Sequence, residues 1–134
     1  LKVMAAQMAQ HAGETQMARA LWTTTYQSTQ DRQIRGNAIA HLRALQVSDD
    51  VNALAALVSQ YKQITGRTPT SLQELVAAHY LKFVPVDPTS RPYHLMSDGT
   101  VQVEVPDDIP FIEKGAPPGY TPPRPKDLEA LGGR

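Results

Sequence analysis

The stretch "VNALAALVSQYKQITGRTPTSLQEL", residues 51–75, holds the most regular helical pattern of the chain and its clearest helix boundary. Its apolar residues recur three and four positions apart, which places them on one helix face: Val51, Leu54, Ala55, Val58, Tyr61 and Ile64. Gly66 follows, where a left-handed glycine commonly ends a helix. Thr70…Gln73 and Ser71…Glu74 both fit the capping box that starts one. We therefore predict a helix ending at Gly66 and a short helix beginning at Thr70 or Ser71.

The residues before this stretch predict three more helices, separated near Gly13, Asp31 and Ser48. Their apolar faces are Leu1, Met4, Ala5 and Met8; Met17, Ala18, Leu21 and Thr25, flanked by Trp22; and Ile34, Ala38, His41 or Leu42, and Leu45. Asp31 has the short acceptor side chain of an N-cap. Ser48 is followed by two acidic residues, which the helix dipole favours in a first turn. The expected fold is mostly α, with about five short helices in antiparallel hairpins resembling tetratricopeptide repeats.

A β-hairpin is predicted after the fifth helix, where the apolar period changes to alternation. A two-residue loop would place the apolar residues of the two strands on opposite faces. A three-residue loop, Ser97-Asp98-Gly99, pairs Leu95 with Val101 and Tyr93 with Val103, so that all of them share one face. We predict the second register, with that face packed on the last two helices, because a lone hairpin is marginally stable in water.

Prolines mark two further segments. Three lie in "VPVDPTSRP", residues 84–92, where they stop the helix and deliver Tyr93 in an extended conformation into the first strand. Seven of the eleven lie in residues 106–134, a segment with few apolar residues to bury. The predicted organisation is a helical region at residues 1–83, a proline-rich loop and hairpin packed on the helices at residues 84–105, and an extended proline-rich tail.

The composition excludes several kinds of protein. Thirteen basic and thirteen acidic residues give a net charge of zero, which removes the electrostatic argument for a nucleic-acid or anionic-membrane partner. The absence of cysteine excludes disulfides, thiolate metal sites and a cysteine nucleophile. No apolar run approaches the roughly 18 residues of a membrane-spanning helix. The chain begins in mid-pattern without an initiator Met, so we expect the natural protein to continue upstream of Leu1, where any targeting segment would lie.

The stretch "AAQMAQHAGETQMARALW", residues 5–22, resembles the helix-turn-helix of one tetratricopeptide repeat. The small residues Ala5 and Ala6 would let helices approach, and Gly13 lies between the two helices. Ala18 with Leu21 and Trp22 resembles the small-then-large pattern of the second helix. The resemblance covers roughly residues 1–65 and is that of the C-terminal end of a bacterial repeat array, whose last helix pair departs from the consensus. It implies a role in protein–protein interaction.

A second segment, from Gly66 to Val103, is similar to the helix, proline-rich loop and strand of the type II secretion major pseudopilins. The residues in corresponding places are Pro85, Asp87, Pro88, Pro92, Tyr93 and Asp98-Gly99. Thr89 and Ser90 replace the Trp-Gly pair of that family, and the long apolar N-terminal helix is missing. A pseudopilin-like chain would have a three- or four-stranded sheet against one long helix. The same pattern follows tetratricopeptide regions in bacterial envelope proteins, which implies an accessory role in the cell envelope.

Asp87 is the strongest polar candidate for a site. By analogy with calcium binding in pseudopilins its carboxylate binds a cation, whereas in the alternative it accepts hydrogen bonds from its own backbone in an Asx-type turn. We favour the turn, because a calcium site needs several more oxygens. The four histidines, His11, His41, His79 and His94, lack the spacing of a helical metal site. We therefore predict no catalytic or cofactor-binding residues, no cofactor, and no metal ligand beyond the candidate Asp87.

Apolar residues of the first helices, including Trp22 and the methionines up to Met17, are expected to be core residues. The first helix nevertheless has an apolar face that this chain does not fully cover, and such a face indicates an interface. The residues predicted to contact other protein subunits, through this face and the tail, are Leu1, Met4, Met8, Pro117, Pro118, Tyr120, Pro122 and Pro123.

The function predicted from these patterns is a non-catalytic protein–protein interaction or scaffold module, an accessory subunit of a larger bacterial assembly. One alternative is a pseudopilin-like component of an envelope secretion machine. Another is a small hydrolase or metal enzyme that uses Asp87, His94 and Arg91.

Overall fold

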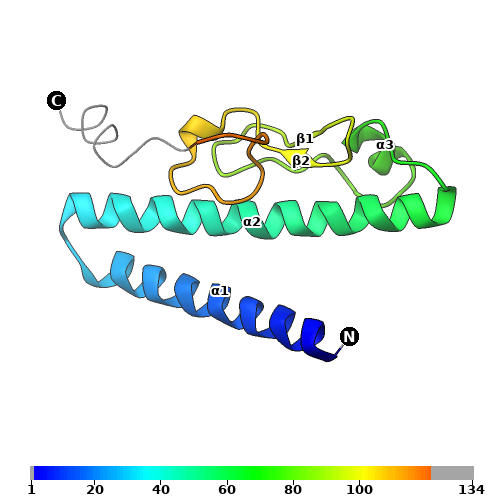
Figure 1. Ribbon diagram of the computed structural model, residues 1–134. Coiled ribbons are helices and arrows are strands. Elements are labelled where there is room, and N and C mark those ends of the chain that lie inside the picture. Colours follow the sequence, from blue (N-terminus) through cyan, green and yellow to red (C-terminus); the bar gives the residue numbers. More distant parts are fainter. Residues whose placement is uncertain (1, 122–134) are drawn as a thin grey trace.

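The computed structural model describes the backbone of residues 2–121 and the side chains of residues 15–121. The elements in chain order are α1 (Lys2–Ser28), α2 (Arg32–Thr65), α3 (Leu72–Ala77), β1 (His94–Leu95), β2 (Val101–Gln102) and the 3-10 turn η1 (Pro106–Asp108). Helices α1 and α2 form an antiparallel hairpin (Figure 1). The shorter elements and their loops lie on the side of α2 opposite α1. Helix α2 is therefore the middle of three layers.

The prediction of about five short helices in tetratricopeptide-like hairpins is wrong. Helix α1 runs without a break through Gly13, and α2 runs through Ser48, so four predicted helices are two long ones. A glycine in a helix interior costs about 1 kcal/mol relative to alanine, which a helix of 27 residues can tolerate. Neither long helix has an apolar stretch sufficient to cross a membrane, and the same holds for the other described helices.

The apparent helix start at Ser48 has a different cause. The two acidic residues that follow it make contacts with other elements. Asp49 pairs with Arg19 of α1, and Asp50 accepts a hydrogen bond from Tyr93. Side chains in the middle of a helix that bind neighbouring elements can thus imitate a capping signal.

The other three helix boundaries were predicted correctly. Asp31 is the N-cap of α2, and its Oδ1 accepts hydrogen bonds from two amides of the first turn, at 2.9 and 3.1 Å. Gly66 ends α2 with φ 79°, and its amide donates to the carbonyl of Lys62. Ser71 is the N-cap of α3 and accepts from the amide of Glu74.

A single hydrophobic core lies between α2 and the layer opposite α1. From α2 it includes Ala44, Val47, Val51, Leu54, Val58 and Tyr61, and from the other layer Leu72, Leu75, Tyr93, Val101, Val103, Ile109 and Ile112. Two residues predicted in the α2 stripe, Ala55 and Ile64, are exposed instead. No described side chain of α1 belongs to this core. We call residues 32–121, which build it, the body.

The hairpin has the predicted register. His94 lies opposite Gln102, and Leu95 lies opposite Val101. Gly99 has φ 87°, as a three-residue loop requires. The described sheet has two strands, and its apolar face packs on α2, where Val101 and Val103 are buried.

Residues 106–121 do not form the extended tail that their prolines predicted. They make η1 and a series of turns that bury Ile109 and Ile112 in the core. Gly115 lies directly on α2 with φ 92°, and a Cβ atom there would be 3.0 Å from Cγ2 of Val51. The two buried isoleucines and the close approach of Gly115, together with the packing of Ala116 and Tyr120, hold this proline-rich segment on the body.

Candidate functional site

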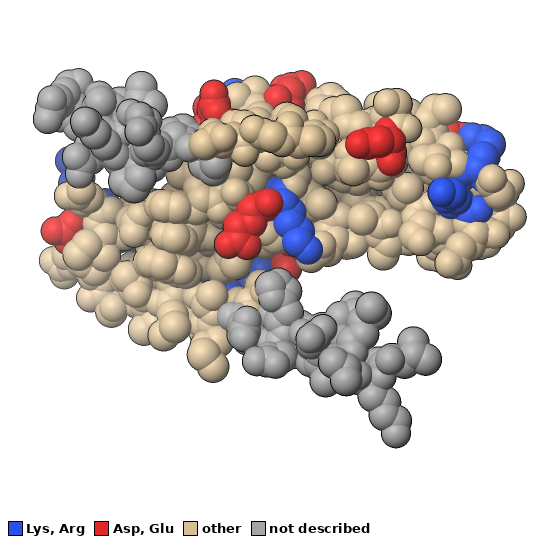
Figure 2. Space-filling view, in the orientation of Figure 1, with Lys and Arg blue, Asp and Glu red and all other residues tan. Residues whose placement is uncertain are grey.

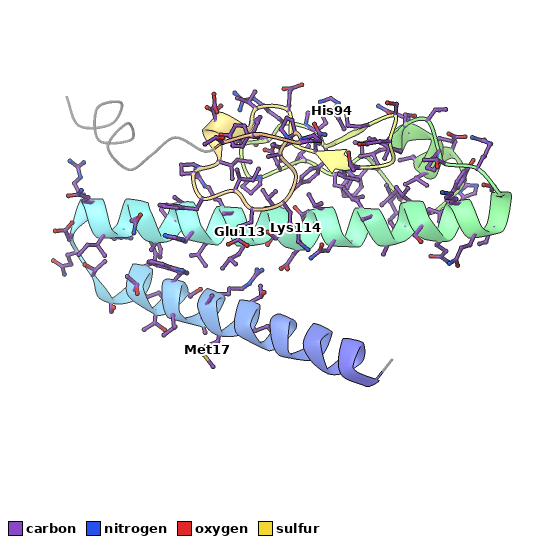
Figure 3. All side chains as sticks on the ribbon, viewed as in Figure 1. Met17, His94, Glu113 and Lys114 are labelled. Carbon is purple, nitrogen blue, oxygen red and sulfur yellow. The ribbon has the colours of Figure 1, made fainter. Side chains whose placement is uncertain are left out.

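The exposed side of the described part of α1 carries two large apolar side chains. Met17 is 66% exposed and Leu21, one turn further, is 63% exposed. Met17 points away from α2 (Figure 3). The exposed side chains between positions 16 and 28, which we call the outer face of α1, are Gln16, Met17, Ala20, Leu21, Thr24, Gln27 and Ser28. The expectation that Met17 is a core residue is wrong, because the body builds its core without it.

The outer face of α1 has no charged residue. Arg19 is the one charged residue between positions 15 and 28, and it pairs with Asp49 of α2. Helices on the surface of globular proteins normally present charged residues to solvent. On the side of the molecule drawn in Figure 2, the surface over the described part of α1 is almost entirely uncharged. Such a surface can be buried in a protein interface without removing a charged group from water, which would be costly.

Three stacked rings connect α1 to the body. His41 of α2 lies between Trp22 of α1 and Phe111, with ring centroids 3.9 and 3.8 Å away and interplanar angles of 5° and 10°. Burial lowers the pKa of His41, and the charge of Glu113 opposes this shift. The imidazole is therefore neutral at pH 7 and acts as a flat spacer between two aromatic rings. Phe111 has φ 67°, a strained value for a bulky residue.

Polar contacts also lead from α1 into the interior of the body. Arg19 contacts Gln46, whose Nε2 donates to Oδ1 of Asp50 over 2.9 Å. The Tyr93 hydroxyl donates to Oδ2 of the same carboxylate over 2.6 Å. Burial raises the pKa of Tyr93 strongly, and the hydrogen bond to Asp50 adds to this. Tyr93 thus stays a proton donor, which suits a structural contact better than acid–base chemistry.

Asp87 adopts the Asx-type turn that was favoured from the sequence. The residue is 3% exposed, and its Oδ1 accepts hydrogen bonds from the amides of Thr89 and Arg91, at 2.7 and 3.3 Å. Its Oδ2 is buried without a hydrogen-bond partner among the described residues. No group of three or more acidic or histidine side chains in the described part of the chain could hold a metal ion. The carboxylate therefore orders its own loop.

The residues of the enzyme hypothesis are bound to other side chains and to backbone groups of their own region. The guanidinium of Arg91 pairs with Asp108 and lies 3.8 Å from Glu104, while Nε2 of His94 is 3.3 Å from Glu104. Oδ1 of Asp87 is used within its own turn. Arg91 and His94 thus share a partner at the protein surface, and Asp87 contacts Arg91 through the Arg91 amide and through the hydroxyl of Thr89.

The two remaining histidines are His11 and His79. His79 is exposed with φ 68°, and the side chain of His11 lies outside the described residues.

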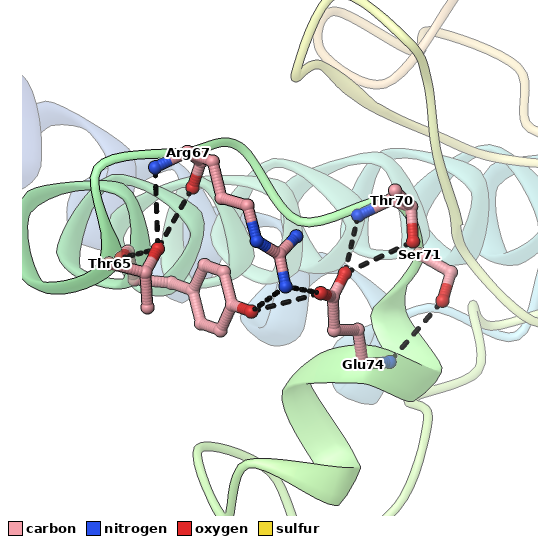
Figure 4. A network of polar contacts seen from close by, with 6 residues as sticks. Thr65, Arg67, Thr70, Ser71 and Glu74 are labelled. Atoms are coloured by element: carbon pink, nitrogen blue, oxygen red, sulfur yellow. Dashed lines mark hydrogen bonds and ion pairs between the residues drawn. The ribbon is translucent and has the colours of Figure 1, made fainter.

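A polar network joins the end of α2 to the start of α3 (Figure 4). Oε1 of Glu74 accepts from the Tyr61 hydroxyl over 2.9 Å and pairs with Arg67, while Oε2 accepts from the amide of Thr70 over 2.7 Å. The hydrogen bond from Arg67, followed by that from the Thr70 amide, lowers the pKa of Glu74 to about 2. Both carboxylate oxygens are occupied by the protein, so this network is a structural clamp.

The predicted contact residues of the tail lie only partly within the described chain. Pro117 and Pro118 are exposed, whereas Tyr120 is half-buried and donates from its hydroxyl to Oδ1 of Asp107 over 2.8 Å. Burial and this hydrogen bond raise the pKa of Tyr120 to about 12. The backbones of Met4 and Met8 lie in α1, but their side chains are outside the described residues, as are Leu1, Pro122 and Pro123.

Comparison with known proteins does not assign this chain to a family. No protein-family model, no curated protein and no solved structure matches this chain. Candidate sites therefore rest on geometry alone, and the outer face of α1 is the described surface that most resembles a place for another molecule.

Proposed function

We propose that this chain is a non-catalytic protein-interaction module, an accessory subunit that binds a helix of another protein through the outer face of α1. The observation that carries the proposal is the exposure of Met17 and Leu21, at 66% and 63%, on a helix face without charge. The body supports this role by holding α1 through its ring stack and its ion pair.

The chemistry of the outer face defines the partner. Met17 and Leu21 form one ridge four residues apart, and such ridges pack into the groove of a second helix. Methionine adapts to different partner surfaces because its side chain is unbranched and polarizable. A charged residue placed opposite this face would lose its water without gaining a counter-ion. The partner segment is therefore an amphipathic helix whose apolar stripe is uncharged.

The proline-rich segment supplies a second contact. Pro117 and Pro118 are exposed next to Tyr120, which is anchored to Asp107. The amide of Tyr120 donates to the carbonyl of Pro117 and closes a turn at Pro118 and Gly119, so the exposed proline pair is held in one conformation and loses little entropy on binding. This contact strengthens binding at the outer face if both engage the same partner.

Site-specific photo-crosslinking tests the proposal. A photoreactive amino acid is placed at position 17 or 21 of the full chain in the cells that produce it, and the crosslinked peptides are identified by mass spectrometry. We expect both positions to capture the same uncharged amphipathic helix of one other protein, and Leu21→Lys to abolish capture from position 17.

Ile64 provides a matched control, because it is 67% exposed but belongs to a different helix, where it lies at the C-terminal end of α2. A label at position 64 should not capture the same segment, and Ile64→Lys should leave capture from position 17 unchanged. Capture of unrelated proteins from positions 17 and 64 alike would refute the proposal, as would capture of only a second copy of this chain.

A pseudopilin-like role is the second candidate, favoured by one observation. A single long helix, α2, supports α3, a proline-rich loop and a hairpin, although the described sheet has two strands where the resemblance implied three or four. The resemblance also implies calcium at Asp87. If this candidate holds, Ca²⁺ should raise the melting temperature of the protein but not that of Asp87→Asn, and an equal response of both would exclude it.

A further inference from the structure

Helix α1 is attached to the body by contacts that do not involve the hydrophobic core. No described side chain of α1 is a core member, and three residues, Thr29 to Asp31, connect it to α2. We propose that α1 is an exchangeable arm, which packs on α2 of a second copy of this chain with the same contacts that it makes on its own α2.

The two surfaces recognise each other by charge and shape. Arg19, the one charge between positions 15 and 28, meets Asp49 on α2. Trp22 stacks on His41 with centroids 3.9 Å apart. Nearer the connection, the guanidinium of Arg35 lies 4.6 Å above the Tyr26 ring. Every one of these pairs joins α1 to α2, so a second copy offers all of them unchanged, and exchange of identical elements is a low-cost route to a dimer.

The connection between the helices is short and lies between two helical hydrogen-bond series. The amide of Thr29 still donates to the carbonyl of Thr25, and the amide of Arg35 donates to that of Asp31. The hydrogen-bond series of α1 thus ends at the amide of Thr29, and the series of α2 begins at the carbonyl of Asp31, two residues later. The N-cap Asp31 has φ −71° and ψ 122°, so its φ is already close to a helical value and its ψ changes when the helix becomes continuous. Neither glycine nor proline occurs among Thr29, Gln30 and Asp31. In the exchanged dimer α1 and α2 therefore form one continuous helix.

The exchange goes beyond the proposed function, because it uses the inner contacts of α1 and leaves the outer face exposed in both forms. Failure of crosslinking from position 17 would not affect it. Likewise, a strictly monomeric chain could still bind another protein through the outer face.

The absence of cysteine in this chain allows a direct test with full-length variants. Chains carrying Arg19→Cys and chains carrying Asp49→Cys are mixed at high concentration, diluted, and treated with a short thiol-specific bismaleimide. Exchange predicts a crosslinked dimer that contains one chain of each kind. The control replaces Asp49→Cys by Gln60→Cys, which lies about three helical turns further along α2 and should give little crosslinked dimer. Equal yields with Asp49→Cys and Gln60→Cys would overturn the proposal.

A second test leaves the contacts between α1 and α2 intact. Gln30→Ala favours a continuous helix and Gln30→Gly disfavours it, and each dimer contains two such connections. The dimerisation constant, measured by sedimentation equilibrium, should therefore be roughly 25-fold larger for Gln30→Ala than for Gln30→Gly. Equal dimerisation constants, or monomers only at all concentrations, would contradict the exchange.

Discussion

Helix α1 and the body differ in what holds them in place. The body contains all thirteen members of the core, drawn from α2 and from a layer made mostly of loops. The described part of α1 is the more regular structure, yet it is joined to the body by an ion pair, a ring stack and a cation–π contact. We therefore expect α1 to be less stable locally than the body, because burial of apolar side chains stabilises a segment more than helix formation itself does.

The largest difference in the free energy of unfolding is expected between the substitution of a leucine in the body and that of a leucine in α1. Leu75 is completely buried, whereas Leu21 is 63% exposed. Leu75→Ala should lower the free energy of unfolding by about 2–5 kcal/mol, and Leu21→Ala by no more than about 0.5 kcal/mol. Urea denaturation followed by circular dichroism measures both, and similar losses would show that α1 contributes to the core after all.

Two glycines in different surroundings provide the next comparison. Gly115 has φ 92°, and an added Cβ would meet Val51 at 3.0 Å, whereas Gly36 in α2 has open space around it. Gly115→Ala should destabilise the protein by about 1–3 kcal/mol through strain and overpacking. Gly36→Ala should stabilise it by up to about 1 kcal/mol. Thermal melts of both variants test the opposite signs, and a neutral Gly115→Ala would mean that the loop is not held against α2.

Glu74 makes the stability of the body depend on pH. Its pKa is about 2 in the folded chain, below the usual 4.5, so its contribution is present above pH 4.5 and is lost as the pH falls towards 2. The urea midpoint of the protein should therefore fall across this range, and Glu74→Gln should make the fall smaller. The comparison of the two pH profiles is the measurement, and identical slopes would contradict the clamp at Glu74.

The smallest effect is expected at the ion pair between α1 and the body. Both side chains are partly exposed, at 35% for Arg19 and 48% for Asp49, and such pairs contribute about 0–1 kcal/mol. Arg19→Ala should therefore change the urea midpoint of the body little, while hydrogen exchange in residues 15–28 becomes faster. A large loss of global stability would show that α1 and the body unfold as one unit.

The sequence predicted those parts of the fold that depend on local chemistry. The register of the hairpin follows from the alternation around Gly99, and the caps Asp31 and Ser71 follow from short acceptor side chains. The failures have a common origin in tertiary contacts. Ser48 and its acidic neighbours looked like a helix start because their partners on other elements are far away in sequence. Residues 106–121 looked extended because composition hides the burial of two isoleucines.

The candidate site residues also divide into those that local sequence predicts and those that depend on tertiary contacts. The turn at Asp87 was predictable, because an aspartate followed by proline and threonine orders its own backbone. The exposure of Met17 was not, because helical periodicity identifies an apolar stripe without showing whether another element covers it. The ring stack was missed entirely, because Trp22, His41 and Phe111 come from three separate segments.

Hydrogen exchange on the whole chain at low concentration tests most directly the claim that α1 is an arm on an independently stabilised body. We expect amides in residues 15–28 to exchange roughly tenfold or more faster than those of the buried stripe of α2, residues 47–61, because α1 opens without global unfolding. Equal protection of the two segments would contradict this claim, since both helices would then be released only when the core unfolds.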